Sequence, residues 1–133
     1  MGPKIIAGAI ALAAGTTCHA GTQDAQPILL VCNELRSHLC QSLSRIIEDR
    51  ATPRTVSIIA ETDPIPENAP VVIHFVQKSR TDDMLSGHLA WSGNEISPGA
   101  GPELELSVMD APLNDEMIAD FAAQLVQTTD LPF

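Results

Sequence analysis

Apolar and polar side chains alternate along residues 70–91, and this alternation predicts a β-hairpin. The bulky side chains of both halves occupy odd positions: Val71, Ile73, Phe75, Leu85, Leu89 and Trp91. Successive side chains of a strand point to opposite faces of a sheet, so the odd residues share one face, which we predict to be the core face. The polar run from Ser79 to Asp83 predicts the turn and, with it, a pairing of Phe75 with Leu85.

The even face of the same hairpin is half apolar and half polar. It carries Val72, His74, Val76, Lys78, Met84, Ser86, His88 and Ala90. Such a face either lies open to solvent or is covered by a helix. If it is open, the candidate contacts with a partner protein are Val72, Val76, Met84 and Ala90. If it is covered, the same residues are ordinary packing residues.

Apolar residues spaced three and four apart predict two amphipathic helices, over residues 34–50 and 114–128. Asn33 or Ser37 is the expected cap of the first helix, and Asn114 that of the second. Shorter apolar or alternating runs predict further strands at residues 27–32, 55–61 and 103–109. Together these elements predict a single α+β domain. We expect a mostly antiparallel sheet of four to five strands with both helices packed on its odd face.

The first twenty residues predict a secretory signal peptide. Lys4 precedes an uncharged apolar run from Ile5 to Ala14, and small residues lead to a cleavage position after Ala20. A buried N-terminal helix fits less well, because the run has no polar stripe. A lipoprotein acylated on Cys18 also fits less well, because Gly15 stands where a leucine-like residue is wanted. We therefore expect a mature domain of residues 21–133 that is periplasmic or secreted.

Removal of the signal peptide leaves two cysteines, Cys32 and Cys40, and an oxidising compartment favours a disulfide between them. In one continuous helix these residues would stand about 12 Å apart along the axis. A disulfide needs alpha carbons within roughly 7 Å. The bridge therefore requires a helix that begins after Cys32, which a cap at Ser37 allows. The alternative is a helix that starts at Pro27 and carries two unbridged thiols.

The chain is acidic, with 17 Asp and Glu residues against 7 Lys and Arg residues and a formal net charge of −10. Binding to nucleic acid or to anionic lipid depends on Lys and Arg side chains that neutralise phosphates. We therefore expect no nucleic-acid partner, and we expect no membrane-spanning segment in the mature chain. An envelope protein of unknown identity is the expected partner.

Two strand histidines provide a second hypothesis. His74 and His88 share the even face with Met84, and this set of nitrogen and sulfur donors suits copper or zinc. The predicted pairing places His74 opposite Ser86, so that His88 is its diagonal neighbour at roughly 7 to 8 Å. This separation makes a shared metal site less favourable than a pair of ordinary strand histidines.

Catalytic motifs are not found in the sequence. It contains no Gly-x-Ser-x-Gly elbow, and Gly99-Ala100-Gly101 lacks the basic residue and the following helix of a phosphate loop. We identify no catalytic residue and no cofactor. The first hypothesis is a non-catalytic accessory protein that acts through protein contacts, the second is a small metal-binding protein, and the third is an enzyme of unknown type.

Overall fold

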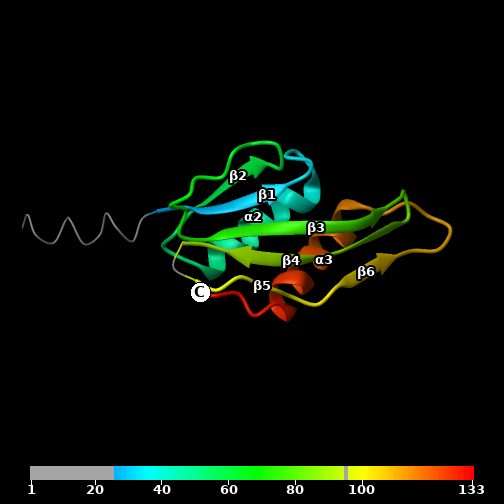
Figure 1. Ribbon diagram of the computed structural model, residues 1–133. Helices are drawn as coiled ribbons and strands as arrows, with labels where there is room; N and C mark the ends of the chain where they lie inside the picture. Colours follow the sequence, from blue (N-terminus) through cyan, green and yellow to red (C-terminus); the bar gives the residue numbers. More distant parts are fainter. Residues whose placement is uncertain (1–25, 95) are drawn as a thin grey trace, which may run out of the picture.

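Residues 26–94 and 96–133 are described by the structure, a computed structural model (Figure 1). The predicted signal peptide, its cleavage after Ala20 and the thiol of Cys18 lie outside the described residues. The described elements are β1 (Ile28–Cys32), α2 (His38–Arg50), β2 (Val56–Ala60), β3 (Val72–Arg80), β4 (Met84–Ser92), β5 (Gly99–Ala100), β6 (Leu104–Ser107) and α3 (Asp115–Thr128).

The strands form one mixed sheet in the order β2-β1-β3-β4, and both β5 and β6 pair with the remaining edge of β4. β1 pairs in parallel with β2 and with β3, whereas the pairs of β4 are antiparallel. The predicted α+β class with two helices is confirmed, but the prediction of a mostly antiparallel sheet is wrong. Parallel neighbours need a long crossover connection, and α2 supplies it between β1 and β2.

Both helices lie behind the sheet in Figure 1, on the side that carries the odd residues of β3 and β4. The buried core joins the two helices to strands β1, β3 and β4 through Ile28, Leu30, Leu39, Leu43, Ile47, Ile73, Phe75, Leu85, Leu89, Phe121, Leu125 and Val126. Each buried methylene group stabilises the fold by about 0.8 kcal/mol. Because this cluster contains many more buried residues than the small cluster on the other side of the sheet, it contributes most of the hydrophobic stabilisation.

Helix α2 begins at His38, four residues after the predicted start. Ser37 is its N-cap, and the Ser37 side chain accepts a hydrogen bond of 3.1 Å from the backbone N–H of Cys40. The late start brings Cys40 back to the end of β1, where it forms a disulfide with Cys32 at a Cα–Cα distance of 6.3 Å. The predicted bridge is thus confirmed, and the alternative of two unbridged thiols is wrong.

Helix α3 has its predicted bounds to within one residue. It runs from Asp115 to Thr128, and the side chain of Asn114 accepts a hydrogen bond of 2.9 Å from the backbone N–H of Met117. Asp115 and Glu116 stand in its first turn, where the helix dipole favours negative charge.

The register of the β3–β4 hairpin differs from the predicted one by four residues. Phe75 pairs with Leu89, so the predicted pairing with Leu85 is wrong. The turn comes later than expected because the strand continues to Arg80. Thr81 closes the turn with a backbone hydrogen bond of 2.9 Å to Met84 and a side-chain bond of 2.8 Å to Asp83. A shift by an even number leaves the odd residues on the core face, as predicted.

Candidate functional site

In residues 26–94 and 96–133, no helix covers the even face of β3 and β4, because α2 and α3 both pack on the other side of the sheet (Figure 1). Near the start of β3, the loop after β2 covers this face. Its residue Ala69 packs against Val31 and Val72, and all three side chains are buried. Val72, a predicted contact residue, is therefore not accessible to a partner in this structure.

The rest of the even face is partly exposed. We call it the open face and define it as His74, Val76, Met84, His88 and Ala90, each of which is half-buried. Three of these five side chains are apolar. The open face therefore contains three of the four predicted contact residues, and their role in binding stays a prediction.

His74 and His88 are diagonal neighbours on the open face, as predicted, but each pairs with a different residue of the opposite strand than predicted. His74 pairs with Ala90 rather than with Ser86, and His88 pairs with Val76. The Nε2 atom of His74 lies 3.4 Å from a carboxylate oxygen of Glu61. A metal ion bound at His74 would have to use the other ring nitrogen or displace Glu61.

Met84, the third predicted metal ligand, pairs with Ser107 of β6, at the hairpin end of β4. Within residues 26–94 and 96–133, no group of three or more His, Cys, Asp and Glu side chains is placed to hold a metal ion. The metal hypothesis for His74, His88 and Met84 stays a prediction.

Side-chain carboxylates occupy both ends of the β2 edge of the sheet. The backbone N–H of Val56 donates to Glu48 at 2.9 Å, and that of Ala60 donates to Asp63 at 3.0 Å. β2 is only five residues long, and its other edge is fully paired with β1. An added strand would have to displace both carboxylates, so this edge is protected against strand addition. A partner protein could bind either to a sheet face or by adding a strand to a sheet edge, and the open face is better suited to binding than the β2 edge.

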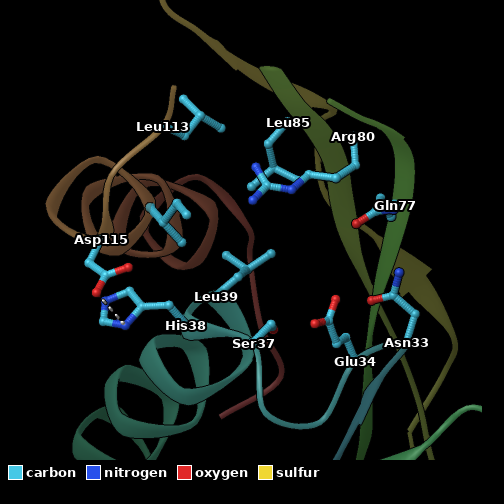
Figure 2. A pocket seen from close by; sticks show the side chains of 11 residues that line it. Asn33, Glu34, Ser37, His38, Leu39, Gln77, Arg80, Leu85, Leu113 and Asp115 are labelled. Carbon is cyan, nitrogen blue, oxygen red and sulfur yellow. Dashed lines mark ion pairs between the residues drawn. The ribbon is translucent and has the colours of Figure 1, made fainter. Parts of the chain in front are cut away.

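A pocket of about 330 Å³ lies on the core side of the sheet, where both helices begin (Figure 2). Its floor is apolar and buried, formed by Leu39, Leu85 and Ile118. Its walls come from the segment before α2, from the hairpin and from the start of α3: Asn33, Glu34, Ser37, His38, Gln77, Arg80, Leu113 and Asp115. Three distant segments of the chain thus meet around one space.

A β-bulge determines which face Arg80 belongs to. The ladder passes from the pair Gln77–Gly87 to the pair Ser79–Ser86, so β3 contains one extra residue, Lys78. After the bulge the odd residue Ser79 lies on the open side, with its hydroxyl 3.0 Å from that of Ser86. Arg80 then pairs with Leu85 on the core side and lines the pocket. Bulges often redirect a side chain in this way next to functional sites.

The ionisable side chains of the pocket are those of Arg80, Glu34, Asp115 and His38. His38 and Asp115 link the beginnings of the two helices, with Nδ1 and Oδ2 4.0 Å apart. Within the part of the chain that the structure describes, no carboxylate oxygen lies within 4.0 Å of the Arg80 guanidinium. Arg80 therefore keeps its hydrogen-bond donors available to a ligand.

Sequence reasoning did not find this pocket. Arg80 was assigned to the turn because it is polar and follows a serine, and a bulge leaves no mark in the pattern of this strand. Of its lining residues, the sequence pattern indicates Asn33 and Ser37 only as candidate helix caps and Leu85 only as a core residue.

Comparison with known proteins gave no matching family model and no significant match to a curated protein. Of the helices described, neither has the length and apolar character needed to cross a membrane. Functional inference for this chain therefore depends on its own geometry.

Proposed function

We propose that the chain is a non-catalytic accessory protein, periplasmic or secreted, that binds a partner protein through the open face. The observation that carries this proposal is the placement of both helices on one side of the sheet, which leaves Val76, Met84 and Ala90 partly exposed on the other side. Apolar side chains gathered on an exposed sheet face are typical of protein-contact surfaces.

The charges around the open face indicate the chemistry of the partner. Glu61 lies beside His74 on one flank, and on the other flank Glu103 forms an ion pair of 3.2 Å with Lys78. Glu105 follows on β6, opposite Ser86 of the open side. An apolar centre flanked by carboxylates is complementary to a partner segment whose apolar side chains are bordered by Lys or Arg. The net charge of −10 favours the same basic partner at long range.

The compartment belongs to the same proposal. The disulfide between Cys32 and Cys40 supports an oxidising environment, because such bonds are rare in reducing compartments. The predicted signal peptide points in the same direction. We propose secretion with cleavage after Ala20, which mass spectrometry of the protein purified from envelope extract or medium would test.

Site-specific photo-crosslinking tests the contact face directly. A photoreactive residue placed at Val76 or at Ala90 is expected to give one defined adduct with an envelope protein in intact cells. The same residue placed at Gln127, which is exposed on α3, is expected to give none. Equal adducts from all three positions, or no adduct from the open face, would contradict the proposal.

A matched pair of substitutions tests the strength of the contact. Ala90→Asp introduces a charge into the open face, opposite His74, and is expected to abolish capture of the crosslinked partner. Ala111→Asp makes the same change in an exposed loop and is expected to leave capture unchanged. Circular dichroism would verify that both variants fold. A folded Ala90→Asp variant that still captures the partner would exclude this face as the binding surface.

A further inference from the structure

We propose that the pocket between the helix starts binds a small apolar zwitterion, an apolar α-amino acid or a dipeptide built from such residues. The first observation is the size and shape of the space. Its volume of about 330 Å³ falls at the lower end of the range for small-molecule sites, roughly 300 to 1,000 Å³. A ligand of up to about twenty heavy atoms, which includes a single amino acid or a small dipeptide, is the class that such a space accepts.

The second observation is the buried apolar floor. Leu39 of α2, Leu85 of β4 and Ile118 of α3 are all at most 8% exposed, yet all three line the pocket. An aliphatic side chain placed on this floor would lose contact with water without displacing any hydrogen bond of the protein. The floor therefore selects for an apolar group on the ligand.

The third observation is the cationic side chain of Arg80 in the wall of the pocket. The bulge at Lys78 turns Arg80 to the core side, and Figure 2 shows its guanidinium extending from the hairpin toward the two helices. A guanidinium presents a planar fork of donors that matches a carboxylate in a bidentate arrangement. Arg80 is thus the group that would bind the carboxylate of the ligand.

The fourth observation separates a zwitterion from a simple anion. Glu34 and Asp115 also line the pocket, so its carboxylates outnumber its guanidinium. A phosphate or another bare anion would meet this excess of negative charge. A zwitterion instead places its carboxylate at Arg80 and its ammonium group at Glu34, whose carboxylate Figure 2 shows entering the same space from the segment before α2. The charges of the pocket are therefore complementary to an amino acid or a dipeptide.

This site is independent of the proposed contact face, because the pocket and the open face lie on opposite sides of the sheet. Loss of one activity would leave the other intact.

Nuclear magnetic resonance spectroscopy of the ¹⁵N-labelled protein tests the proposal. The protein is expressed as the full chain and purified after secretion. Titration with L-leucine and with leucyl-leucine is expected to shift the backbone amides of Glu34, Leu39, Arg80 and Ile118. Leucinamide lacks the carboxylate and N-acetylleucine lacks the ammonium group. Each is expected to bind at least about tenfold more weakly, which is the usual effect of losing one charge-assisted hydrogen bond.

Two variants with matched controls assign the groups. Arg80→Gln and Glu34→Gln are each expected to weaken leucine binding about tenfold or more. Arg36→Gln and Glu116→Gln change exposed residues that do not line the pocket and are expected to bind leucine as the unmodified protein does. Failure of both zwitterions to shift pocket amides would overturn the proposal. Equal binding of leucinamide or N-acetylleucine, or unaltered binding by a folded Arg80→Gln variant, would overturn it as well.

Discussion

Cys32 and Cys40 fix the geometry of the segment that separates β1 from α2. Both are buried, one as the last residue of the strand and the other in the first turn of the helix. Their bond holds the exposed residues Asn33 to Arg36 in a closed loop on the wall of the pocket. The sequence predicted this geometry. Within one continuous helix the two cysteines would stand too far apart for a disulfide, so the bridge required α2 to begin after Cys32.

The disulfide is expected to contribute substantially to stability. Removing it with Cys32→Ser and Cys40→Ser together should lower the free energy of unfolding by about 2 to 3 kcal/mol, the estimate for a short closed loop. Urea denaturation of the purified secreted protein would measure this. Reductant should reproduce the loss in the unmodified protein and leave the double variant unchanged. A response of the double variant to reductant, or equal stability of all forms, would contradict the prediction.

At the scale of elements, helix ends were predictable where one polar side chain determines them. Asn114 followed by two acids marked the start of α3 because an amide cap and carboxylates both satisfy a helix terminus. The parallel strands were missed, although a strand, a helix and a second strand in succession indicate a parallel pair joined by a crossover helix. The hairpin register was missed because strand and turn residues around Arg80 are equally polar.

The N-cap of α3 provides a test of whether one polar side chain determines where the helix begins. Asn114→Ala removes the acceptor for the backbone N–H of Met117 and should lower the free energy of unfolding by about 1 kcal/mol. Asn68→Ala makes the same change in the exposed loop before β3 and should alter it by less than about 0.5 kcal/mol. Urea midpoints at a constant slope would give both values. Equal losses in the two variants would show that the cap is not the cause.

At the scale of the whole molecule, the two faces of the sheet produce two different candidate sites. The helices cover one face and form the pocket with it, and the other face carries the partly exposed open face. The open face could be predicted as one of two alternatives, because the alternation of β3 and β4 gathers its residues on one side. The pocket could not be predicted, since its walls combine residues near 34, 80 and 115 that no periodicity connects. Such a site depends on topology rather than on local pattern.

The excess of acidic side chains acts on the molecule as a whole. Self-repulsion at a net charge of −10 should destabilise the folded state at low salt, so sodium chloride up to about 0.5 M is expected to raise the urea midpoint. A variant with Asp49→Asn, Asp120→Asn and Asp130→Asn removes three exposed charges and should respond less to salt. A midpoint that stays constant or falls with salt would contradict this expectation.

The closed loop between Cys32 and Cys40 also bears on how this chain could diversify. The covalent bond and the Ser37 cap anchor both ends of the loop, so the identity of Asn33 to Arg36 contributes little to the core. Substitutions of Asn33 and Glu34 can alter the lining of the pocket while the strand and the helix stay in place. The loop is therefore a natural position for evolving or grafting new ligand preferences onto an unchanged scaffold.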